Sequence, residues 1–500
     1  MLRTRREILR HLAGAGGLSL FASRFLAGCD DGSATPTRDA AVEGALDGSL
    51  PLDAAGSADS ALVDPEGRWW LSGNYAPVAD EVEILDLTID GALPPELVGT
   101  YVRNGSNPQA GSSGHWFLGD GMLHGLRLEG GRARWYRNRF IQTAQLAQPG
   151  GGGPVPTLER NGSNVSLVHH ARKILTLGEV GYPYEVRADL STVGMHTFGG
   201  QLTTAMTAHP KVDPVTGELL FFGYWFLPPY LTYHRADASG ALVYSQEVAL
   251  PASVMMHDFA ITETRVVFMD LPILFDLAVA AAGGSFPFKW TPSNGARLGL
   301  MDRAGGAVRW FAIEACFSFH VLNAFDMGNK VVVDVVRHPS LWANGVDDFT
   351  SEPRLWRFII DPDADEVAEA QLSEHPLEFP MGDRRFTGRP HRHAWAVGSE
   401  GIDFLGPDAR HLILHHDLQT GAVHQHALGA THQTSEALFV PGGAGEGEGW
   451  LLAWQYDRTR NTSDLAVYNA TDVEPGPIAR VRLPRRVPFG FHGAFIPDET

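Results

Sequence analysis

The sequence predicts an all-β fold of many short strands, arranged as a propeller or a barrel. Composition is the first reason: 44% of the 500 residues are hydrophobic, and 56 Gly and 32 Pro favour short elements joined by turns over long helices. The second reason is pattern, because apolar runs such as GELLFFGYWF, KVVVDVV and GWLLAWQY alternate with turn sequences such as Asp-Pro-Val-Thr-Gly. No strict repeat of fixed length is visible, so the pattern alone leaves both architectures open.

The charge is strongly acidic outside the N-terminal segment. The formal net charge is −19, and five arginines with one glutamate give residues 1–28 a charge of +4, which leaves −23 for the remainder. A body this acidic repels the phosphate backbone, so we do not expect a nucleic-acid partner.

Residues 1–29 are predicted to be an export signal. The segment has a basic head, a weakly apolar middle and the sequence Leu-Ala-Gly-Cys, and no run approaches the roughly 20 apolar residues of a membrane span. Arg5 and Arg6, followed by Glu-Ile-Leu-Arg, resemble a twin-arginine signal, with an ordinary signal as the alternative. Leu-Ala-Gly-Cys resembles a bacterial lipobox. Cys29 would then carry lipid and anchor a lipoprotein to the membrane on the periplasmic or cell-surface side.

Residues 30–66 are predicted to be a disordered tether, and residues 67–500 the folded domain. The tether is rich in Ala, Asp, Gly and Ser and almost lacks aromatic residues, so it cannot bury enough apolar surface to fold. Beyond Cys29 the chain has one cysteine, Cys316, and therefore no intramolecular disulfide. We expect Cys316 to be a small buried hydrophobic residue.

Residues 271–290, LPILFDLAVAAAGGSFPFKW, interrupt the β pattern with an apolar run. Two interpretations stay open, because an apolar run does not say whether it faces the core or lipid. The segment is either a helix buried beneath a cap, or an apolar entrance that contacts a membrane surface.

Four histidines occur in similar settings, each near a strand-like run: His209, His257, His320 and His492. Their separations of 48, 63 and 172 residues match no short metal-binding motif. A propeller, however, brings the inner strands of all blades to one axis, where distant histidines could share a metal. Taken singly, each is as well explained as an ordinary structural histidine. We expect the same for His115 and His124 near a turn, and an exposed alternating pattern for His391, His393, His415, His416, His424 and His426.

Eight motifs resolve this ambiguity because together they resemble the carotenoid cleavage oxygenase family, which includes retinoid isomerases and stilbene-cleaving enzymes. The resemblance runs from about residue 67 to 497, in the family's order. The motifs are GTYVRNGSNP (99–108), HWFLGDGMLHGLRLEGGRARWYRNRF (115–140), AHPKVDPVTGELLFFGY (208–224), MMHDFAITETRVVFMDLP (255–272), FHVLNAFD (319–326), LEFP (377–380), SEALFVP (435–441) and FHGAF (491–495).

The resemblance implies a seven-bladed β-propeller with a helical and loop dome over one Fe(II) per chain. The implied ligands, and the residues that carry catalysis, are His209, His257, His320 and His492. Neutral imidazoles leave the iron its full charge and leave positions open for dioxygen as co-substrate. Ligand histidines usually donate their second N–H to a carboxylate, and the resemblance places this role on Glu179, Glu378 and Glu436.

The implied activity is that of an oxidoreductase, a dioxygenase that cleaves a carbon–carbon double bond of a carotenoid or apocarotenoid into two carbonyl products. One alternative is a stilbene-cleaving enzyme, but the segment YRNRFIQTAQLAQ offers glutamine and no lysine where a phenol partner is expected. Isomerisation is a second alternative, and a propeller lipoprotein that only binds carotenoids or other lipids is a third. The expected partners are an apolar small molecule and a membrane surface, reached through the lipid anchor and residues 271–290.

Overall fold

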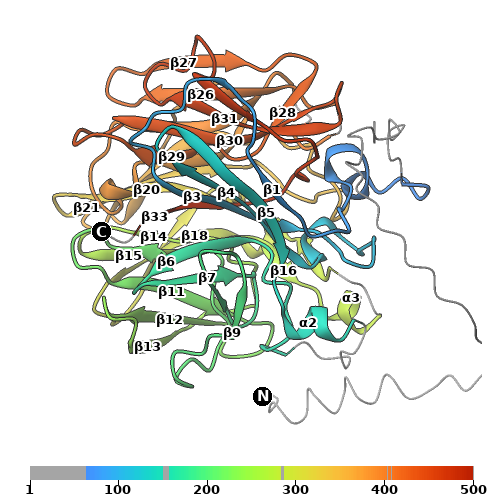
Figure 1. Ribbon diagram of the computed structural model, residues 1–500. Coiled ribbons are helices and arrows are strands. Elements are labelled where there is room, and N and C mark those ends of the chain that lie inside the picture. Colours follow the sequence, from blue (N-terminus) through green and yellow to red (C-terminus); the bar gives the residue numbers. More distant parts are fainter. Residues whose placement is uncertain (1–63, 150–156, 283–285, 402–403, 407, 499–500) are drawn as a thin grey trace, which may run out of the picture. The chain divides into compact units, whose positions relative to one another are not determined.

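The computed structural model describes residues 64–149, 157–282, 286–401, 404–406 and 408–498. The predicted signal and nearly all of the predicted tether lie outside these ranges. Within them the strands form eight antiparallel sheets (Figure 1). Seven of these have four to six strands and confirm the predicted seven-bladed propeller, and the eighth is a two-stranded hairpin.

Five sheets, I to V, are formed by consecutive stretches of the chain, four strands to each. Sheet I contains β6 (Ser166–His170), β7 (Lys173–Leu177), β8 (Tyr184–Val186) and β9 (Thr192–Met195). Sheet II contains β10 (Lys211–Val212), β11 (Leu219–Tyr224), β12 (Leu231–Ala236) and β13 (Leu242–Val248). Sheet III contains β14 (Ala260–Ile261), β15 (Arg265–Asp270), β18 (Ala296–Asp302) and β19 (Arg309–Ile313). Sheet IV contains β20 (Val321–Met327), β21 (Lys330–Arg337), β22 (Arg354–Asp361) and β23 (Glu366–Gln371). Sheet V contains β24 (Leu377–Gly382), β25 (His393–Ser399), β26 (His411–Asp417) and β27 (Ala422–Ala427).

The last two sheets join the N-terminal and C-terminal parts of the domain, so that no sheet edge is left open where the ring closes. Arg103 pairs with Gly493, and Gly99 pairs with Pro497. Sheet VI contains β2 (Ile89–Gly91), β28 (His432–Thr434), β29 (Leu438–Pro441), β30 (Gly449–Asp457), β31 (Thr462–Asn469) and β32 (Ala479–Arg482). Sheet VII contains β1 (Glu83–Leu85), β3 (Gly99–Ser106), β4 (Gly121–Glu129), β5 (Arg132–Phe140) and β33 (Gly493–Pro497).

The first strands of neighbouring sheets meet at the propeller axis. β14 contacts β20, β20 contacts β24, β24 contacts β29, β29 contacts β33 and β33 contacts β6. Strands in the middle of a sheet, such as β11 and β30, are buried nearly throughout because both faces pack on neighbouring sheets. Outer strands such as β13 and β23 alternate between half-buried and exposed residues. Loops that precede the first strands therefore converge on the axis.

The helical elements of the described residues are all short, with five residues at most. The short helical elements are η1 (Trp69–Leu71), η2 (Gly73–Tyr75), η3 (Trp116–Leu118), α2 (Ala144–Ala147), α3 (Leu277–Ala281), η4 (Pro292–Asn294) and η5 (Arg384–Phe386). No helix among the described residues is long and apolar enough to span a bilayer.

The described part of residues 271–290 contains two paired strands with a short helix between them in the chain, and not a buried helix. β16 (Ile273–Phe275) pairs with β17 (Phe288–Trp290), and α3 between them contains no buried residue. Asp276 ends the first strand because its carboxylate caps α3 by accepting from the backbone N–H groups of Ala278 and Val279. Ile273 is fully buried, whereas Leu277 is 48% exposed. The buried part of this run is thus a strand and not the helix of the first interpretation, and the second interpretation, an apolar entrance at a membrane, stays a prediction.

The expected exposure of the alternating histidines is wrong. His415 and His416 are buried because their strand, β26, lies inside sheet V between β25 and β27. Nδ1 of His393 lies 2.9 Å from Nε2 of His415, and Nε2 of His416 lies 2.9 Å from Oγ of Ser373. Cys316 is buried, as expected.

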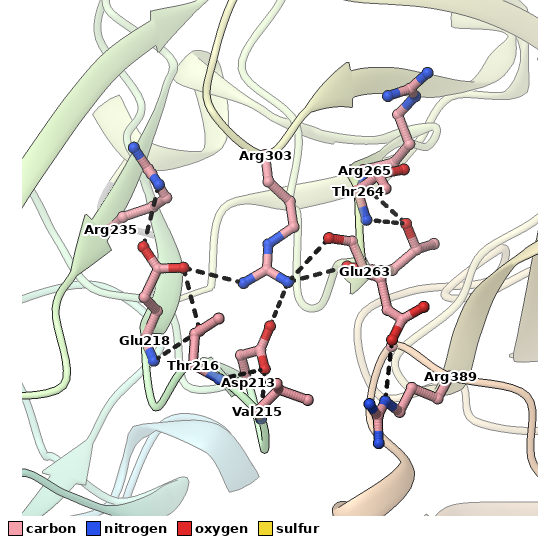
Figure 2. A network of polar contacts seen from close by, with 12 residues as sticks. Asp213, Val215, Thr216, Glu218, Arg235, Glu263, Thr264, Arg265, Arg303 and Arg389 are labelled. Carbon is pink, nitrogen blue, oxygen red and sulfur yellow. Dashed lines mark hydrogen bonds and ion pairs between the residues drawn. The ribbon is translucent and has the colours of Figure 1, made fainter.

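A buried cation joins sheets II and III on the loops that connect their strands (Figure 2). The guanidinium of Arg303, which follows β18, forms an ion pair with Asp213 and donates to Oε2 of Glu218 at 3.3 Å. It also donates to the carbonyl oxygen of Thr262 at 3.3 Å. Asp213 in turn accepts from the backbone N–H groups of the turn between β10 and β11. We call these residues the Arg303 network.

Candidate metal centre

Four histidines meet on the axis because each stands just before the first strand of its sheet. His209 precedes β10, His257 precedes β14, His320 precedes β20 and His492 precedes β33. One potential ligand nitrogen from each lies within 4.8 Å of the other three. The four histidines can therefore meet although they are far apart in the sequence, because each occupies the equivalent position in its blade.

The geometry of the four imidazoles fits a metal ion. Nε2 of His209 lies 2.9 Å from Nε2 of His257, and Nε2 of His320 lies 3.1 Å from Nε2 of His492. A metal–nitrogen bond of about 2.1 Å places neighbouring ligands of an octahedral ion about 3 Å apart. The donor set contains nitrogen alone, a set that suits iron, zinc, copper or nickel better than magnesium or calcium.

Three glutamates contact the outer nitrogens of three of these imidazoles. Nδ1 of His257 lies 3.0 Å from Oε2 of Glu179, Nδ1 of His320 lies 2.5 Å from Oε2 of Glu378, and Nδ1 of His492 lies 2.8 Å from Oε1 of Glu436. A proton on Nδ1 leaves the lone pair of Nε2 facing the other histidines. No carboxylate of a described residue contacts His209 in this way.

The three carboxylates are themselves held by further contacts. Oε1 of Glu378 accepts from Nε2 of His338 at 2.7 Å, and Oε2 of Glu436 accepts from the backbone N–H of Gly493 at 2.8 Å. Oε1 of Glu179 accepts from the hydroxyl of Tyr224 at 3.1 Å. These contacts fix the orientation of the acids, and through them the orientation of the imidazoles.

The backbone beside Glu378 is irregular. The register of β24 shifts between Glu378 and Met381, and Phe379 has φ of +54°, which is unfavourable for a residue with a side chain. The Phe379 ring lies 5.5 Å from the rings of both His320 and His492. The bulge thus directs the carboxylate of Glu378 and the ring of Phe379 toward His320, at a cost in backbone strain.

The protonation preferences favour neutral imidazole at His209 and His320 and ionised carboxylate at Glu378, whereas His257 differs. Burial lowers the pKa of His209 well below its usual range, and the neighbouring histidines lower it further. Burial also lowers the pKa of His320, although Glu378 opposes this. Burial would raise the pKa of Glu378, but His320 and His338 outweigh it, so that the pKa is lowered. For His257 burial acts to lower the pKa, and Glu179 reverses the sign to a net increase.

A cavity of about 340 Å³ opens on one face of the histidines. His257, His320 and His492 line it, and its other walls are mainly aromatic. These aromatic residues are Trp116, Phe117, Tyr224, Trp225, Phe226, Phe275, Phe286, Phe288, Phe319, Phe349, Phe379, Phe404 and Phe491. We call this space the aromatic cavity. It can hold an apolar molecule against the histidines and exclude water.

A second cavity, of about 380 Å³, opens on a different side of the same histidines, and we call it the polar cavity. His320 and His492 line both cavities, whereas His209 lines the polar cavity and His257 the aromatic one. The polar cavity also contains Lys211 and Asp258, whose side chains pair at 2.8 Å. An ion held by the four histidines would therefore lie between an apolar space and a polar one.

The structure brings together the four histidines and three glutamates that the sequence predicted, whereas Cys29 lies outside the described residues. It adds two residues that sequence reasoning missed. His338 stands at the end of a strand with no motif around it, so nothing marks its contact with Glu378. Tyr224 ends the motif AHPKVDPVTGELLFFGY, and that position could have drawn attention to it. Cys316 is buried, and burial raises the pKa of its thiol to about 11; it does not belong to the histidine group.

Comparisons with known proteins agree with this geometry. A family model described as "Retinal pigment epithelial membrane protein" (RPE65) matches residues 75–497. A carotenoid 9,10(9',10')-cleavage dioxygenase of Crocus sativus is 34% identical over 493 residues, covering 86% of this chain and 89% of that protein. An isoeugenol monooxygenase of Pseudomonas nitroreducens is 30% identical, covering 85% and 98%.

Solved structures give the same result. A lignostilbene dioxygenase of Pseudomonas brassicacearum superposes with a TM-score of 0.79 at 30% identity, covering 86% of this chain and 98% of that one. A cobalt-substituted apocarotenoid oxygenase of Synechocystis superposes with a TM-score of 0.77 at 26% identity, covering 86% and 98%. These relatives confirm the expectation of an oxidoreductase of the oxidative-cleavage dioxygenase type. The chain belongs to the RPE65 and carotenoid cleavage oxygenase family.

Proposed function

We propose that this protein binds one Fe(II) through His209, His257, His320 and His492, and uses dioxygen to cleave a carbon–carbon double bond of a carotenoid or apocarotenoid into two carbonyl products. One observation carries the proposal: four Nε2 atoms converge with no acid among them, and three of the four histidines line the aromatic cavity. The chemistry that the iron supplies when bound is the activation of dioxygen.

The residues of the chain have three roles in this proposal. The histidines hold the ion, and the acids at Glu179, Glu378 and Glu436 orient their rings. The aromatic walls position one bond of a long conjugated molecule near the histidines and keep water away from it.

A stilbene is the second candidate substrate, because the lignostilbene and isoeugenol enzymes among the relatives bear names of aromatic alkenes. The cavity wall favours the carotenoid class. Among its described residues it has no lysine, and its one tyrosine, Tyr224, already donates its hydroxyl to Glu179. A phenol would therefore meet neither a lysine nor an unengaged tyrosine among the described residues of this wall.

The test is anaerobic reconstitution with Fe(II), followed by incubation with carotenoids, apocarotenoids and stilbenes in labelled oxygen. Mass spectrometry should find two carbonyl fragments from a carotenoid or apocarotenoid, with label from dioxygen. If only stilbenes are cleaved, the substrate class is stilbenes and not carotenoids. If the product is an isomer of unchanged mass, the reaction is isomerisation and not cleavage. Tight binding without turnover, in protein shown to contain iron, would favour the carotenoid-binding lipoprotein.

The location of the protein is a separate proposal, supported by the paired arginines and by Leu-Ala-Gly-Cys near the N-terminus. Replacing Arg5 and Arg6 by lysine should retain folded precursor in the cytoplasm, and Cys29→Ser should release the protein from the membrane fraction. Normal export of the double-lysine form would argue against the twin-arginine pathway, and a serine form that still sediments with membranes would argue against the lipid anchor.

The tip of the hairpin at residues 273–290 is proposed to touch the membrane. Leu277 and Val279 are 48% and 39% exposed on α3, while Phe275 and Phe288 of the same hairpin line the aromatic cavity. Replacing Leu277 and Val279 by serine, in protein lacking residues 1–63, should slow cleavage of liposome-borne substrate and leave detergent-dispersed substrate unaffected. Replacing two other exposed valines by serine is the control: Val215, in the turn between β10 and β11, and Val243, on β13.

A further inference from the structure

The aromatic cavity contains one cation whose role in the site is not explained by the metal centre. Arg160 is the only arginine or lysine among the described residues that line the cavity. It lies in the segment between sheets VII and I and shares the cavity with the three histidines named above. A charged side chain in a wall this apolar calls for a partner.

Arg160 has no acidic partner within the described part of the chain. Its Nη1 donates to the carbonyl oxygen of Ala144 at 3.4 Å, and its Nη2 donates to the carbonyl oxygen of Gln148 at 3.0 Å. Both acceptors belong to α2 or to the residue that ends it. A guanidinium carries five N–H groups, so these two bonds orient the side chain and leave donors for a further acceptor.

The neighbouring amides of the wall are used differently. Nδ2 of Asn161 donates to the carbonyl oxygens of Leu158 and Tyr182, and its Oδ1 accepts from the backbone N–H of Ser163. Nδ2 of Asn164 donates to two backbone carbonyl oxygens as well. These two side chains therefore hold the wall together, whereas the guanidinium of Arg160 has N–H groups beyond the two that bond Ala144 and Gln148.

We propose that Arg160 binds a carboxylate at one end of the substrate. This inference rests on the proposed function, and it makes the substrate class an apolar conjugated acid rather than a hydrocarbon. A carboxylate accepts two charge-assisted hydrogen bonds from a guanidinium, and the pairing would fix how far the chain extends toward the histidines. The anchored end would thus select which double bond lies beside them.

The experiment compares an apocarotenoid acid with its methyl ester, which has the same length and no charge. Wild type, Arg160→Gln and Arg160→Lys are assayed for cleavage, and for binding by quenching of tryptophan fluorescence in metal-free protein. Trp116 and Trp225 line the cavity, so bound polyene should quench them. Arg187→Gln, at an exposed arginine outside the cavity, is the matched control.

Wild type should bind and cleave the acid in preference to the ester. Arg160→Gln should weaken binding of the acid and lower its kcat/KM by about 10- to 100-fold, the range for a hydrogen bond to a charged group. Values for the ester should change less than about twofold. Arg160→Lys should recover part of the loss because it restores the charge without the planar fork.

Equal losses for acid and ester would overturn the proposal, since they would show a structural role for Arg160. A wild type without preference for the acid would overturn it as well. Failure of the proposed function gives a different result: no substrate is cleaved, yet Arg160→Gln still weakens binding of the acid to metal-free protein, and the anchoring role then stands.

Discussion

Two buried polar clusters, the four-histidine centre and the Arg303 network, are assembled in a similar way but differ in how their polar atoms are paired. Each gathers side chains that are far apart in the sequence, from loops next to strands of different blades. In the Arg303 network every cation faces acceptors: Arg303 meets Asp213, Glu218 and the carbonyl oxygen of Thr262 (Figure 2). In the histidine centre the acids lie outside, and four Nε2 atoms face one another.

The difference shows which cluster needs a ligand. Hydrogen bonds and ion pairs satisfy the Arg303 network within the protein, so it can stabilise the fold without any bound group. The histidine centre cannot satisfy itself in this way, because protons held on Nδ1 by three glutamates leave lone pairs directed at a common point. A cation is the partner that such a point requires. Variants of the two clusters should therefore differ in what they lose.

The largest expected effect is loss of metal from His320→Ala. This change removes a nitrogen and leaves the carboxylate of Glu378 without its closest contact, which lies at 2.5 Å. Iron affinity after anaerobic reconstitution should fall by more than the about 10- to 100-fold that outer contacts of a metal site contribute. Metal content by mass spectrometry is the readout, and His424→Ala, a histidine on β27 outside the centre, should keep its iron. Full iron content in His320→Ala would contradict the conclusion that the histidine centre, unlike the Arg303 network, is a metal site.

Arg303→Met should give the opposite result, lower stability with unchanged metal content. Removal of one partner leaves buried Asp213 without its counter-charge, a loss of about 3 kcal/mol in the free energy of unfolding. Adding Asp213→Asn should restore part of this, since the amide oxygen can still accept from the backbone of the turn. Denaturant unfolding and iron content, measured on the same samples, separate the two outcomes. Loss of iron in folded Arg303→Met would show that the clusters are coupled.

The same network predicts a dependence on pH. Burial would raise the pKa of Asp213, but hydrogen bonds from Thr216 and Arg303 lower it overall. Because the folded-state pKa is lowered, the stabilisation by the carboxylate is complete above the usual value of about 4 and is lost as the pH falls below it. The stability difference between wild type and Asp213→Asn should therefore shrink in acid. A difference that grows in acid would contradict this sign.

Glu378→Gln should have a smaller effect than loss of a histidine. Glutamine can still accept from one imidazole, but it cannot serve as an anionic acceptor for both His320 and His338. We expect iron affinity to fall by about 10- to 100-fold with little change in unfolding. Glu436→Gln, which alters the same contact to His492, is the matched variant and should behave alike. Unchanged affinity in both would limit the acids to a structural role.

The sequence was sufficient for the fold class and for the residues of the centre, but not for their surroundings. Runs of β-branched residues between turns indicate strands without reference to neighbours, and the histidines and acids stand in motifs that resemble the family. His338 has no motif, and its role depends on which loop folds over Glu378. His415 and His416 were expected to be exposed, because alternation within one strand does not reveal that both faces of β26 are covered. The sequence likewise does not show that Arg160 lines the aromatic cavity, because most other residues of that wall come from distant parts of the chain.

The smallest expected effect tests how far the ordering of the centre extends outward. The hydroxyl of Tyr224 donates to Oε1 of Glu179, whose other oxygen contacts His257, so the tyrosine lies two contacts from the metal position. Tyr224→Phe removes this hydrogen bond and leaves the ring that lines the cavity. We expect iron affinity to fall about three- to tenfold, less than the full value of a hydrogen bond to a charged group, because Glu179 keeps its contact with His257.

Substitution with Co(II) gives a readout independent of substrate, since a less ordered His257 should alter the visible spectrum of the bound ion. Tyr182→Phe is the matched control, because this half-buried tyrosine makes no hydrogen bond to Glu179 within the described structure. Equal changes in both variants would indicate a general effect of losing a hydroxyl. A Tyr224→Phe protein with wild-type affinity and spectrum would show that the ordering ends at Glu179, and that the histidine centre, like the Arg303 network, is fixed by its immediate contacts alone.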